Sequence, residues 1–290
     1  MNSYHADFPV PNISGPIGVF DSGYGGLTIL DGIRQRMPQY DYIYLGDNAR
    51  APYGTRSFDV VYEFTLQAVK KLFSYGCPLV ILGCNTASAK ALRSIQQEYL
   101  PVNAPDRRVL GVIRPTAEVV GQLSSTKHIG VLATEGTIRS ESYKLEIEKL
   151  HPGSTIVGQA CPMWVPLVEN NEFDKPGADY FVKDSLNKLM AKDPLIDTII
   201  LGCTHYPLLM EKIKKYCSPN ITLVPQGKYI AESLENYLHR HAEMEQRLTR
   251  GGDCLYLTTE SRTKFRECAS LFLKEDVVVE RVKLQESVNL

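Results

Sequence analysis

The sequence of 290 residues lacks any long apolar segment, any run of basic residues and any CxxC motif. A membrane-spanning helix needs about 20 consecutive apolar residues, and no segment approaches that length. Basic and acidic residues nearly balance, 32 against 33, so the chain has none of the excess positive charge typical of nucleic-acid-binding proteins. We therefore expect neither a membrane nor a nucleic acid as a partner.

The start of the chain, MNSYHADFPVPNISG, has neither the basic nor the apolar region of a signal peptide. We expect residues 1–14 to form a flexible N-terminal arm and the protein to be cytoplasmic. Disulfides are rare in a reducing cytoplasm, and the number of cysteines, seven, is odd. The only tight Cys/His pair is Cys203 with His205, whereas a structural zinc site needs four ligands. The sequence predicts free thiols and no metal site.

Short apolar runs alternate with helical patterns along most of the chain. The clearest helical segment is 57–76, with Ser57 as the expected N-cap and Gly76 as the stop, and similar patterns occupy 178–192 and 261–274. Several apolar runs are apolar on both faces, as strands of a helix-covered parallel sheet are. This alternation predicts an α/β fold with mainly parallel sheets. The expected strands are 16–20, 42–47, 79–84, 109–113, 128–134, 155–161, 198–203, 221–226 and 254–259.

Two short patterns occur twice, in the same order. Ile-Gly-Val begins at Ile17 and again at Ile129, and Leu-Gly-Cys ends at Cys84 and again at Cys203. The repetition predicts two similarly built α/β domains: residues 15–108 plus 225–290 in the first, and 109–224 in the second. In open α/β sheets the ligand binds beyond the carboxyl ends of the strands. If the two domains face each other, both cysteines line one interdomain cleft.

Two thiols facing one cleft suit the inversion of an amino acid at its α-carbon. One group removes the proton from one face while the other returns a proton to the opposite face. A free cysteine titrates near about 8.5, so such a site must make one thiol a thiolate and keep the other protonated. Asp21 at the end of the first strand could serve Cys84, and His205 could serve Cys203. Since no lysine stands in a recognisable pyridoxal-phosphate setting, we expect no cofactor.

A purely structural interpretation competes with this one. Free cysteine is among the most buried residue types, so a single Leu-Gly-Cys strand end favours a place in the core. The DSGYGG segment lacks the Gly-Lys-Ser/Thr of a P-loop and the third glycine of a dinucleotide fingerprint, so its glycines are consistent with a tight turn. The paired occurrence of the cysteine motif, followed by Asn-Thr or Thr-His, favours the functional interpretation.

A series of segments resembles the signature blocks of the bacterial glutamate racemase family, within the cofactor-independent aspartate/glutamate racemases. They run in order from about Ile17 to about Leu257, and the two cysteine blocks together are very specific. The segments are GVFDSGYGGLTIL (18–30), YLGDNARAPYGTRS (44–57), ILGCNTASA (81–89), GVIRPT (111–116), GVLATEGTIRSESY (130–143), CPMWVPLVE (161–169) and LGCTHYPLL (201–209).

The resemblance implies a cofactor-independent enzyme that interconverts L- and D-glutamate for peptidoglycan synthesis, with the active site between two α/β domains. It implies that Cys84 removes the proton from D-glutamate and Cys203 from L-glutamate. Glu169 matches the acidic residue associated with His205, and Asp21 can pair with the substrate ammonium. The substrate-binding residues that it implies are Asp21, Ser22, Tyr53, Gly54, Asn85, Thr86, Thr134, Thr137, Thr204 and His205.

Two other functions stay open at this point. One is an aspartate or other amino-acid racemase of the same family, and the other is a non-catalytic protein that closes on an amino acid. The combination of Asp-Ser-Gly, Pro-Tyr-Gly and Cys-Thr-His-Tyr resembles the glutamate enzymes more than their aspartate relatives. Without the resemblance, Tyr53 and Gly54 are equally consistent with a simple turn, and Glu169 with a solvated carboxylate. The sequence also leaves a homodimer open.

Overall fold

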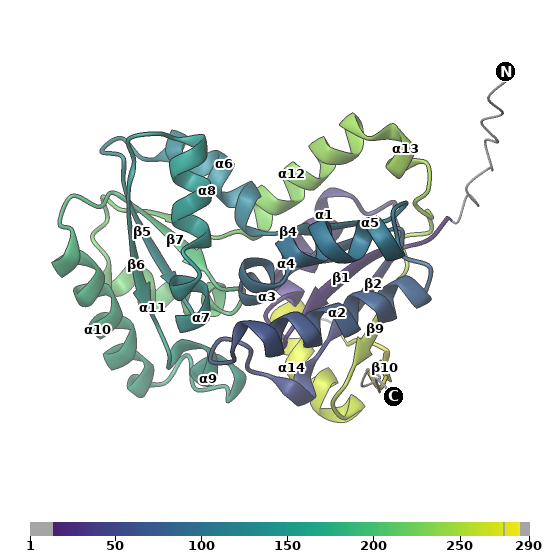
Figure 1. The fold of residues 1–290 in the computed structure, drawn as a ribbon. Coiled ribbons are helices and arrows are strands. Elements are labelled where there is room, and N and C mark those ends of the chain that lie inside the picture. The colour runs from purple at the N-terminus through teal and green to yellow at the C-terminus, as the bar shows by residue number, and fades with distance from the viewer. Residues whose placement is uncertain (1–13, 275, 285–290) are drawn as a thin grey trace, which may run out of the picture.

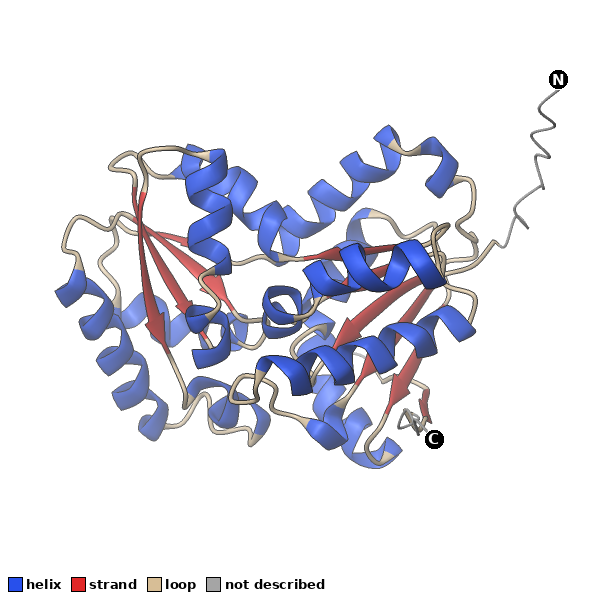
Figure 2. Ribbon diagram, viewed as in Figure 1, coloured by secondary structure: helices blue, strands red, loops and turns tan. Residues whose placement is uncertain are grey.

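Two β-sheets, each made of parallel strands, lie side by side, and each is between layers of helices (Figures 1 and 2). The computed structural model describes residues 14–274 and 276–284, so the arm expected at 1–14 lies outside it except for Ser14. The first sheet has six strands in the order β10-β9-β2-β1-β3-β4, and the second has four in the order β6-β5-β7-β8. All strand pairs in both sheets are parallel. The predicted α/β fold with parallel sheets is confirmed.

Every strand expected from the sequence is present. The short strand β10 was not predicted, because three residues are too few to show a period. The strands are β1 (Ile17–Asp21), β2 (Tyr42–Gly46), β3 (Leu79–Leu82), β4 (Arg108–Gly111), β5 (His128–Ala133), β6 (Thr155–Ala160), β7 (Thr198–Gly202), β8 (Thr222–Val224), β9 (Cys254–Thr258) and β10 (Val279–Arg281).

The helices form the outer layers of both halves. In the first half they are α1 (Leu27–Arg36), α2 (Phe58–Ser74), α3 (Asn85–Lys90), α4 (Leu92–Ser94), α5 (Leu100–Asn103), α12 (Gly227–Arg240), α13 (Ala242–Glu245) and α14 (Arg262–Leu273). In the second half they are α6 (Ile113–Leu123), α7 (Glu135–Arg139), α8 (Ser142–Leu150), α9 (Trp164–Glu169), α10 (Pro176–Lys192) and α11 (Met210–Tyr216). Single turns of 3₁₀ or π helix occupy Asn48–Arg50, Ile95–Tyr99 and Tyr206–Leu209.

Local sequence signals set where these helices begin and end. Ser57 caps α2 by accepting a hydrogen bond from the Val60 N–H, and Gly76 follows the helix with a φ of +89°, as predicted. Ser261 caps α14 in the same way through the Lys264 N–H.

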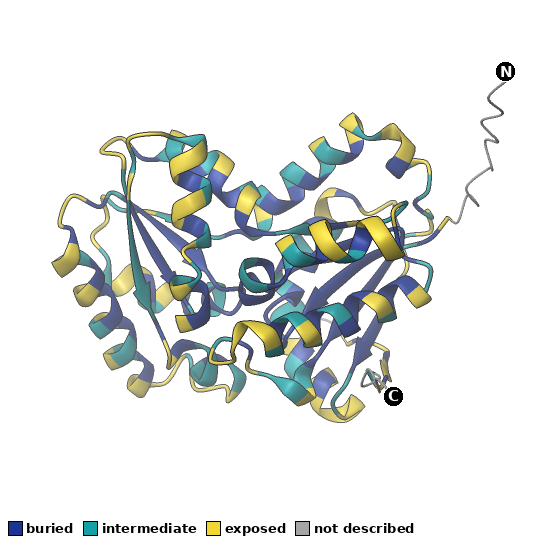
Figure 3. Cartoon of the chain, viewed as in Figure 1, coloured by how far each residue is buried: buried dark blue, intermediate teal, exposed yellow. Residues whose placement is uncertain are grey.

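The central strands of each sheet are buried on both faces, which is why they read as continuous apolar runs (Figure 3). In the six-stranded sheet, α1, α12 and α14 pack on one face, and α2 with α3 and the segment after it packs on the other. In the four-stranded sheet, α9, α10 and α11 pack on one face, and α6 with α8 on the other.

The sequence repeat corresponds to a repeat of topology. The strands that contain Ile-Gly-Val, β1 and β5, are central. The strands that lead to Cys84 and Cys203, β3 and β7, pair beside them. The order β2-β1-β3-β4 in the first sheet therefore matches β6-β5-β7-β8 in the second, and β9 and β10 extend the first sheet alone. Strand order reverses between β1 and β3 and between β5 and β7, which is where open α/β sheets bind ligands.

The pairing of the strands indicates where the chain passes from one half of the molecule to the other. The boundary expected between residues 108 and 109 falls inside β4, which pairs with β3 in the six-stranded sheet. We propose that the first domain comprises residues 14–112 plus the described chain from 225 onward, and the second 113–224. The shift is needed because β4 is the counterpart of β8, the last strand of the second repeat.

Within the described part of the chain, no helix combines the length and apolarity that crossing a bilayer requires. All seven cysteines are free thiols, as predicted.

Candidate active site

Cys84 lies just beyond the carboxyl end of β3 and is the N-cap of α3. Its Sγ accepts a hydrogen bond from the Ala87 N–H at 3.4 Å and lies 3.2 Å from the Ser22 Oγ. Ser22 directly follows β1, so the adjacent strands β1 and β3 bring together two residues that are 62 positions apart. The thiol is buried, with 6% of Cys84 exposed.

Asp21 lies beside this thiol, at the end of β1. One of its carboxylate oxygens accepts a hydrogen bond from the Gly23 N–H at 2.9 Å, while Oδ1 is buried and accepts no hydrogen bond of ordinary geometry from the described residues. Burial raises the pKa of Asp21, and the nearby positive charge of His205 offsets part of that rise. Burial, together with the charge of Asp21, raises the pKa of Cys84 to about 12. The Cys84 side is thus arranged to hold a protonated thiol.

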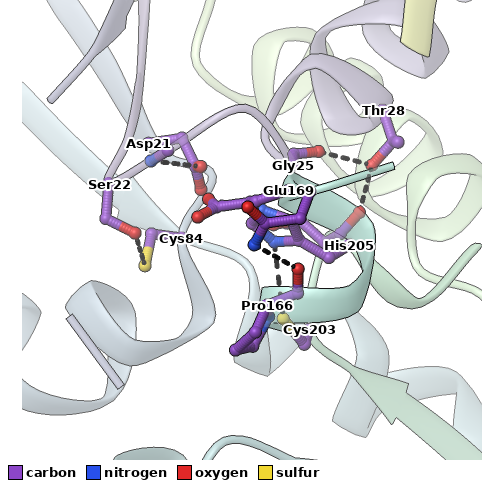
Figure 4. Close-up of polar contacts among 12 residues, drawn as sticks. Asp21, Ser22, Gly25, Thr28, Cys84, Pro166, Glu169, Cys203 and His205 are labelled. Carbon is purple, nitrogen blue, oxygen red and sulfur yellow. Dashed lines mark hydrogen bonds and ion pairs between the residues drawn. The ribbon is translucent and has the colours of Figure 1, made fainter. Parts of the chain in front are cut away.

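Cys203 occupies the equivalent position in the second half, just beyond the end of β7. Its Sγ lies 3.8 Å from His205 Nδ1, and His205 Nε2 lies 3.1 Å from Glu169 Oε1 at the end of α9. Figure 4 shows Cys203, His205 and Glu169 together with the Ser22–Cys84 pair. The chain from thiol through imidazole to carboxylate joins three residues named in the sequence analysis, two of which, Glu169 and His205, the family resemblance also associates.

The partners of His205 determine its charge. Burial lowers the pKa of His205, but the hydrogen bonds to Cys203 and Glu169 outweigh burial and raise it to about 10. The imidazole is therefore a cation near neutral pH. The Cys203 side of the site therefore places a positive charge beside the thiol.

The turn that follows β1 brings the two thiol environments together. Ser22 contacts Cys84, while a Cβ placed on Gly23 would lie 2.8 Å from Glu169 Oε1. A Cβ on Gly25 would lie 2.4 Å from Thr204 Oγ1 and 2.5 Å from His205 Nδ1. The glycines of DSGYGG therefore serve more than a tight turn, since they allow the Cys203 loop to approach the first half closely. Thr28 adds a hydrogen bond from its Oγ1 to the Thr204 carbonyl at 3.1 Å.

Three threonines meet where α3 of the first half faces α7 of the second. The hydroxyl oxygen of Thr86 lies 3.0 Å from that of Thr134 and 3.3 Å from that of Thr137, which lie 3.1 Å from each other. Thr134 is the N-cap of α7. Hydroxyls and N–H groups at helix starts are suitable donors for a carboxylate.

Tyr53 and Gly54 lie at the same junction in different ways. The hydroxyl of Tyr53 donates to Asp47 Oδ2, and the side chain is buried in the first half. The Gly54 carbonyl accepts a hydrogen bond from the Gly136 N–H of α7 at 2.8 Å. Gly54 therefore contacts the second half through its backbone carbonyl, whereas the Tyr53 hydroxyl is bonded to Asp47 within the first half.

Sequence reasoning missed two buried polar residues that support the site, Asp47 and Gln226. Asp47, fully buried, accepts hydrogen bonds from Tyr53, Arg50 and Thr259. Gln226 bonds to the predicted site residue Asn85. The signal that could have found them is their place, because Asp47 directly follows β2 and Gln226 lies two residues after β8.

Among the described residues, no group of three or more His, Cys, Asp or Glu side chains is arranged to hold a metal ion. The polar groups of the site are instead two thiols, two carboxylates, an imidazole and several hydroxyls. Such groups can accept and donate protons and can hold a charged amino acid.

Comparisons with known proteins point in one direction. The family model described as Asp/Glu/Hydantoin racemase matches residues 27–232. The chain is 38% identical over 274 residues to a glutamate racemase of Ruegeria sp. (strain TM1040), covering 91% of this chain and 98% of that protein.

Solved structures give the same result at the level of the fold. The glutamate racemase isoform RacE1 from Bacillus anthracis has a TM-score of 0.85 and 33% identity, covering 93% of this chain and 98% of that one. A glutamate racemase from Francisella tularensis subsp. tularensis SCHU S4, in complex with D-glutamate, has a TM-score of 0.82 and 32% identity with the same coverage.

Proposed function

The chain belongs to the Asp/Glu/hydantoin racemase family, and from this premise we propose that it interconverts L- and D-glutamate without a cofactor. One observation carries the proposal most strongly: equivalent strand ends of two similar halves each carry a buried cysteine, and the turn at 21–25 contacts Cys84 through Ser22 and lies close to Thr204 and His205, the residues that follow Cys203. The relatives named glutamate racemase, one of them in complex with D-glutamate, support this choice of substrate.

In the L-to-D direction, Cys203 acts as the base and Cys84 as the acid. The thiolate of Cys203, which lies beside the His205 cation, takes the α-proton of L-glutamate. The thiol of Cys84 then gives its proton to the opposite face of the α-carbon. This leaves D-glutamate, a protonated Cys203 and a Cys84 thiolate, which is the form that takes the proton of D-glutamate in the reverse direction.

Asp21 and His205 are the groups that help each cysteine change its protonation state. Burial raises the pKa of the Asp21 carboxyl, and this favours the protonated form, which can give its proton to a Cys84 thiolate. On the other side, Glu169 orients His205 and supports its positive charge. The buried Asp21 Oδ1 is also a suitable partner for the substrate ammonium.

The remaining predicted residues hold the substrate. Hydroxyls of Ser22, Thr86, Thr134 and Thr137, with the N–H groups at the starts of α3 and α7, supply donors for the two carboxylates. Gly54, Asn85 and Thr204 complete the walls of the site, with Tyr53 supporting the Gly54 segment from within the first half. The reaction would supply D-glutamate for peptidoglycan in the cytoplasm.

A circular-dichroism assay tests the substrate. Purified protein, in the presence of a chelator and without added cofactor, should reduce the signal of L-glutamate to zero and leave that of L-aspartate unchanged. Loss of the L-aspartate signal instead would favour the alternative racemase, and no change with either would contradict racemisation of both acids.

Deuterium labelling tests the two-base mechanism. In D₂O, D-glutamate formed early from L-glutamate should carry deuterium at the α-carbon, because the S–H proton of Cys84 has already exchanged with solvent. The remaining L-glutamate should still be largely protiated. Equal early labelling of both enantiomers would indicate a single base.

A further inference from the structure

Gln226 lies where the chain crosses between the two halves. One crossing runs from the end of β4 at Gly111 to the start of α6 at Ile113, and the other runs from β8 to α12 through Gln226. Gln226 Nε2 donates to Thr116 Oγ1 on α6 at 2.8 Å and lies 3.4 Å from the Val112 carbonyl. A single side-chain amide therefore bridges both crossings.

The same amide closes a ring of hydrogen bonds between the halves. Gln226 Nε2 donates to the Tyr143 hydroxyl of α8 at 2.6 Å, and that hydroxyl donates to Asn85 Oδ1 at 2.6 Å. Asn85 Nδ2 donates back to Gln226 Oε1 at 2.7 Å. Each member of the ring donates once and accepts once within it, and each is only 3% exposed.

The ring ends beside one of the two thiols. Asn85 is the first residue of α3 and follows Cys84, which caps that helix. Both ends of the Asn85 amide are bonded to residues outside the first sheet, namely Tyr143 of the second half and Gln226 of the crossing. The start of α3, and with it Cys84, is therefore tied to the second half and to the crossing segments at once.

We propose that Gln226 is a positioning residue that holds Cys84 in register with the second half, and so sets how the two thiols face a bound substrate. The proposal rests on the proposed racemase function. Both cysteines are nearly inaccessible in this structure, at 6% exposure each, so substrate entry requires the halves to separate and then return to one relative position. A closed ring at the crossing is suited to define that position, because buried amides and hydroxyls lose their partners in any other.

The test replaces Gln226 by Met, which has a similar length and volume but no amide. We expect kcat/KM for glutamate to fall about 10- to 100-fold in both directions, as expected for a small misplacement of a reacting group. The decisive readout is the isotope effect of α-deuterated substrate. If Cys84 is displaced, the effect on kcat/KM should increase for D-glutamate, from which Cys84 takes the proton, and decrease for L-glutamate.

Two further variants separate positioning from a general loss of stability. Gln67→Met removes a buried amide of α2 whose bonds, to Glu63 and Arg50, stay within the first half, and it should leave both isotope effects unchanged. Tyr143→Phe opens the ring at another member and should shift the isotope effects in the same direction as Gln226→Met. The double variant should be no slower than Gln226→Met alone, because residues of one ring do not contribute additively.

The outcomes distinguish this inference from the function on which it rests. A wild-type protein that does not racemise glutamate contradicts the proposed function. An active wild type with a Gln226→Met variant within about twofold of its kcat/KM, or with symmetric isotope effects, overturns the positioning role. If Gln226→Met does not fold, Tyr143→Phe decides by the same two measurements.

Discussion

Cys84 and Cys203 end equivalent strands of two similar sheets, yet their surroundings are opposite in charge. Cys84 lies beside a hydroxyl and the carboxylate of Asp21, whereas Cys203 lies beside the His205 cation. A carboxylate disfavours a thiolate, and a cation favours it. The repeated fold therefore supplies two thiols at matching places, and the charged groups beside them differ in sign.

The largest effect should come from removing either thiol. Cys84→Ala and Cys203→Ala should each abolish racemisation, since inversion needs a donor and an acceptor together. The circular-dichroism assay with L-glutamate and with D-glutamate measures this. Cys77→Ala, which removes another buried thiol two residues before β3 begins, is the matched control and should stay active. Substantial racemisation by either active-site variant would contradict the two-base assignment.

The second-largest effect should come from Asp21 and His205, which make the surroundings of the two cysteines different. Asp21→Asn and His205→Asn should each slow turnover by about 10²–10⁴-fold, the usual contribution of acid/base assistance. The isotope effects should separate them, with the D-glutamate reaction more sensitive in Asp21→Asn and the L-glutamate reaction in His205→Asn. Asp21→Asn should not lose stability, since burial penalises the ionised carboxylate that it removes. A fully active Asp21→Asn protein would remove its role beside Cys84.

A third change, Gly25→Ala, acts on the contact between the surroundings of Cys84 and those of Cys203, and not on either cysteine itself. The Cβ of Gly25→Ala would collide with Thr204 and His205, so the Cys203 loop must move. A displacement of about 1 Å can cost on the order of 10²-fold in rate, so we expect kcat/KM to fall by about that factor. Gly177→Ala on α10, where nothing lies within 4 Å of the new Cβ, is the control. Equal activity of both variants would show that the close approach is dispensable.

The smallest effect should follow removal of the negative charge of Glu169, whose carboxylate contacts His205. A hydrogen bond to a charged group contributes about 1.5–3 kcal/mol, so Glu169→Gln should lower the pKa of His205 by about one to two units. The alkaline limb of the pH profile of kcat/KM should move to lower pH. An unchanged limb would mean that His205 does not control it.

The same pKa shift predicts a pH dependence of stability. His205 has a pKa of about 10 in the folded protein against 6.5 without its partners, so protonation stabilises the fold fully below pH 6.5. That contribution is lost as the pH rises through 10. In Glu169→Gln the loss should occur at lower pH, which urea unfolding between pH 7 and 10 measures. Identical curves for both proteins would contradict the coupling.

Local signals made much of this fold predictable. Strand runs such as 79–82 and 198–202 are apolar on both faces, and Ser57 and Ser261 are helix caps whose side chains bond within three residues. The β4 strand was found but placed with the wrong repeat at the expected boundary, because the sequence shows that a strand exists and not which neighbour it pairs with.

By itself the sequence determined the α/β alternation, the two repeats and the cysteine that follows the third strand of each. It could do so because strand burial, helix capping and the order of motifs are properties of short segments. Only the tertiary structure decided that Ser22 meets Cys84 and that Gln226 closes a ring with Asn85 and Tyr143. These contacts join residues 58 to 141 positions apart, so they depend on the order of the strands in each sheet and on how the two halves pack. No local pattern encodes that packing, because the same strand and helix signals are compatible with many relative placements.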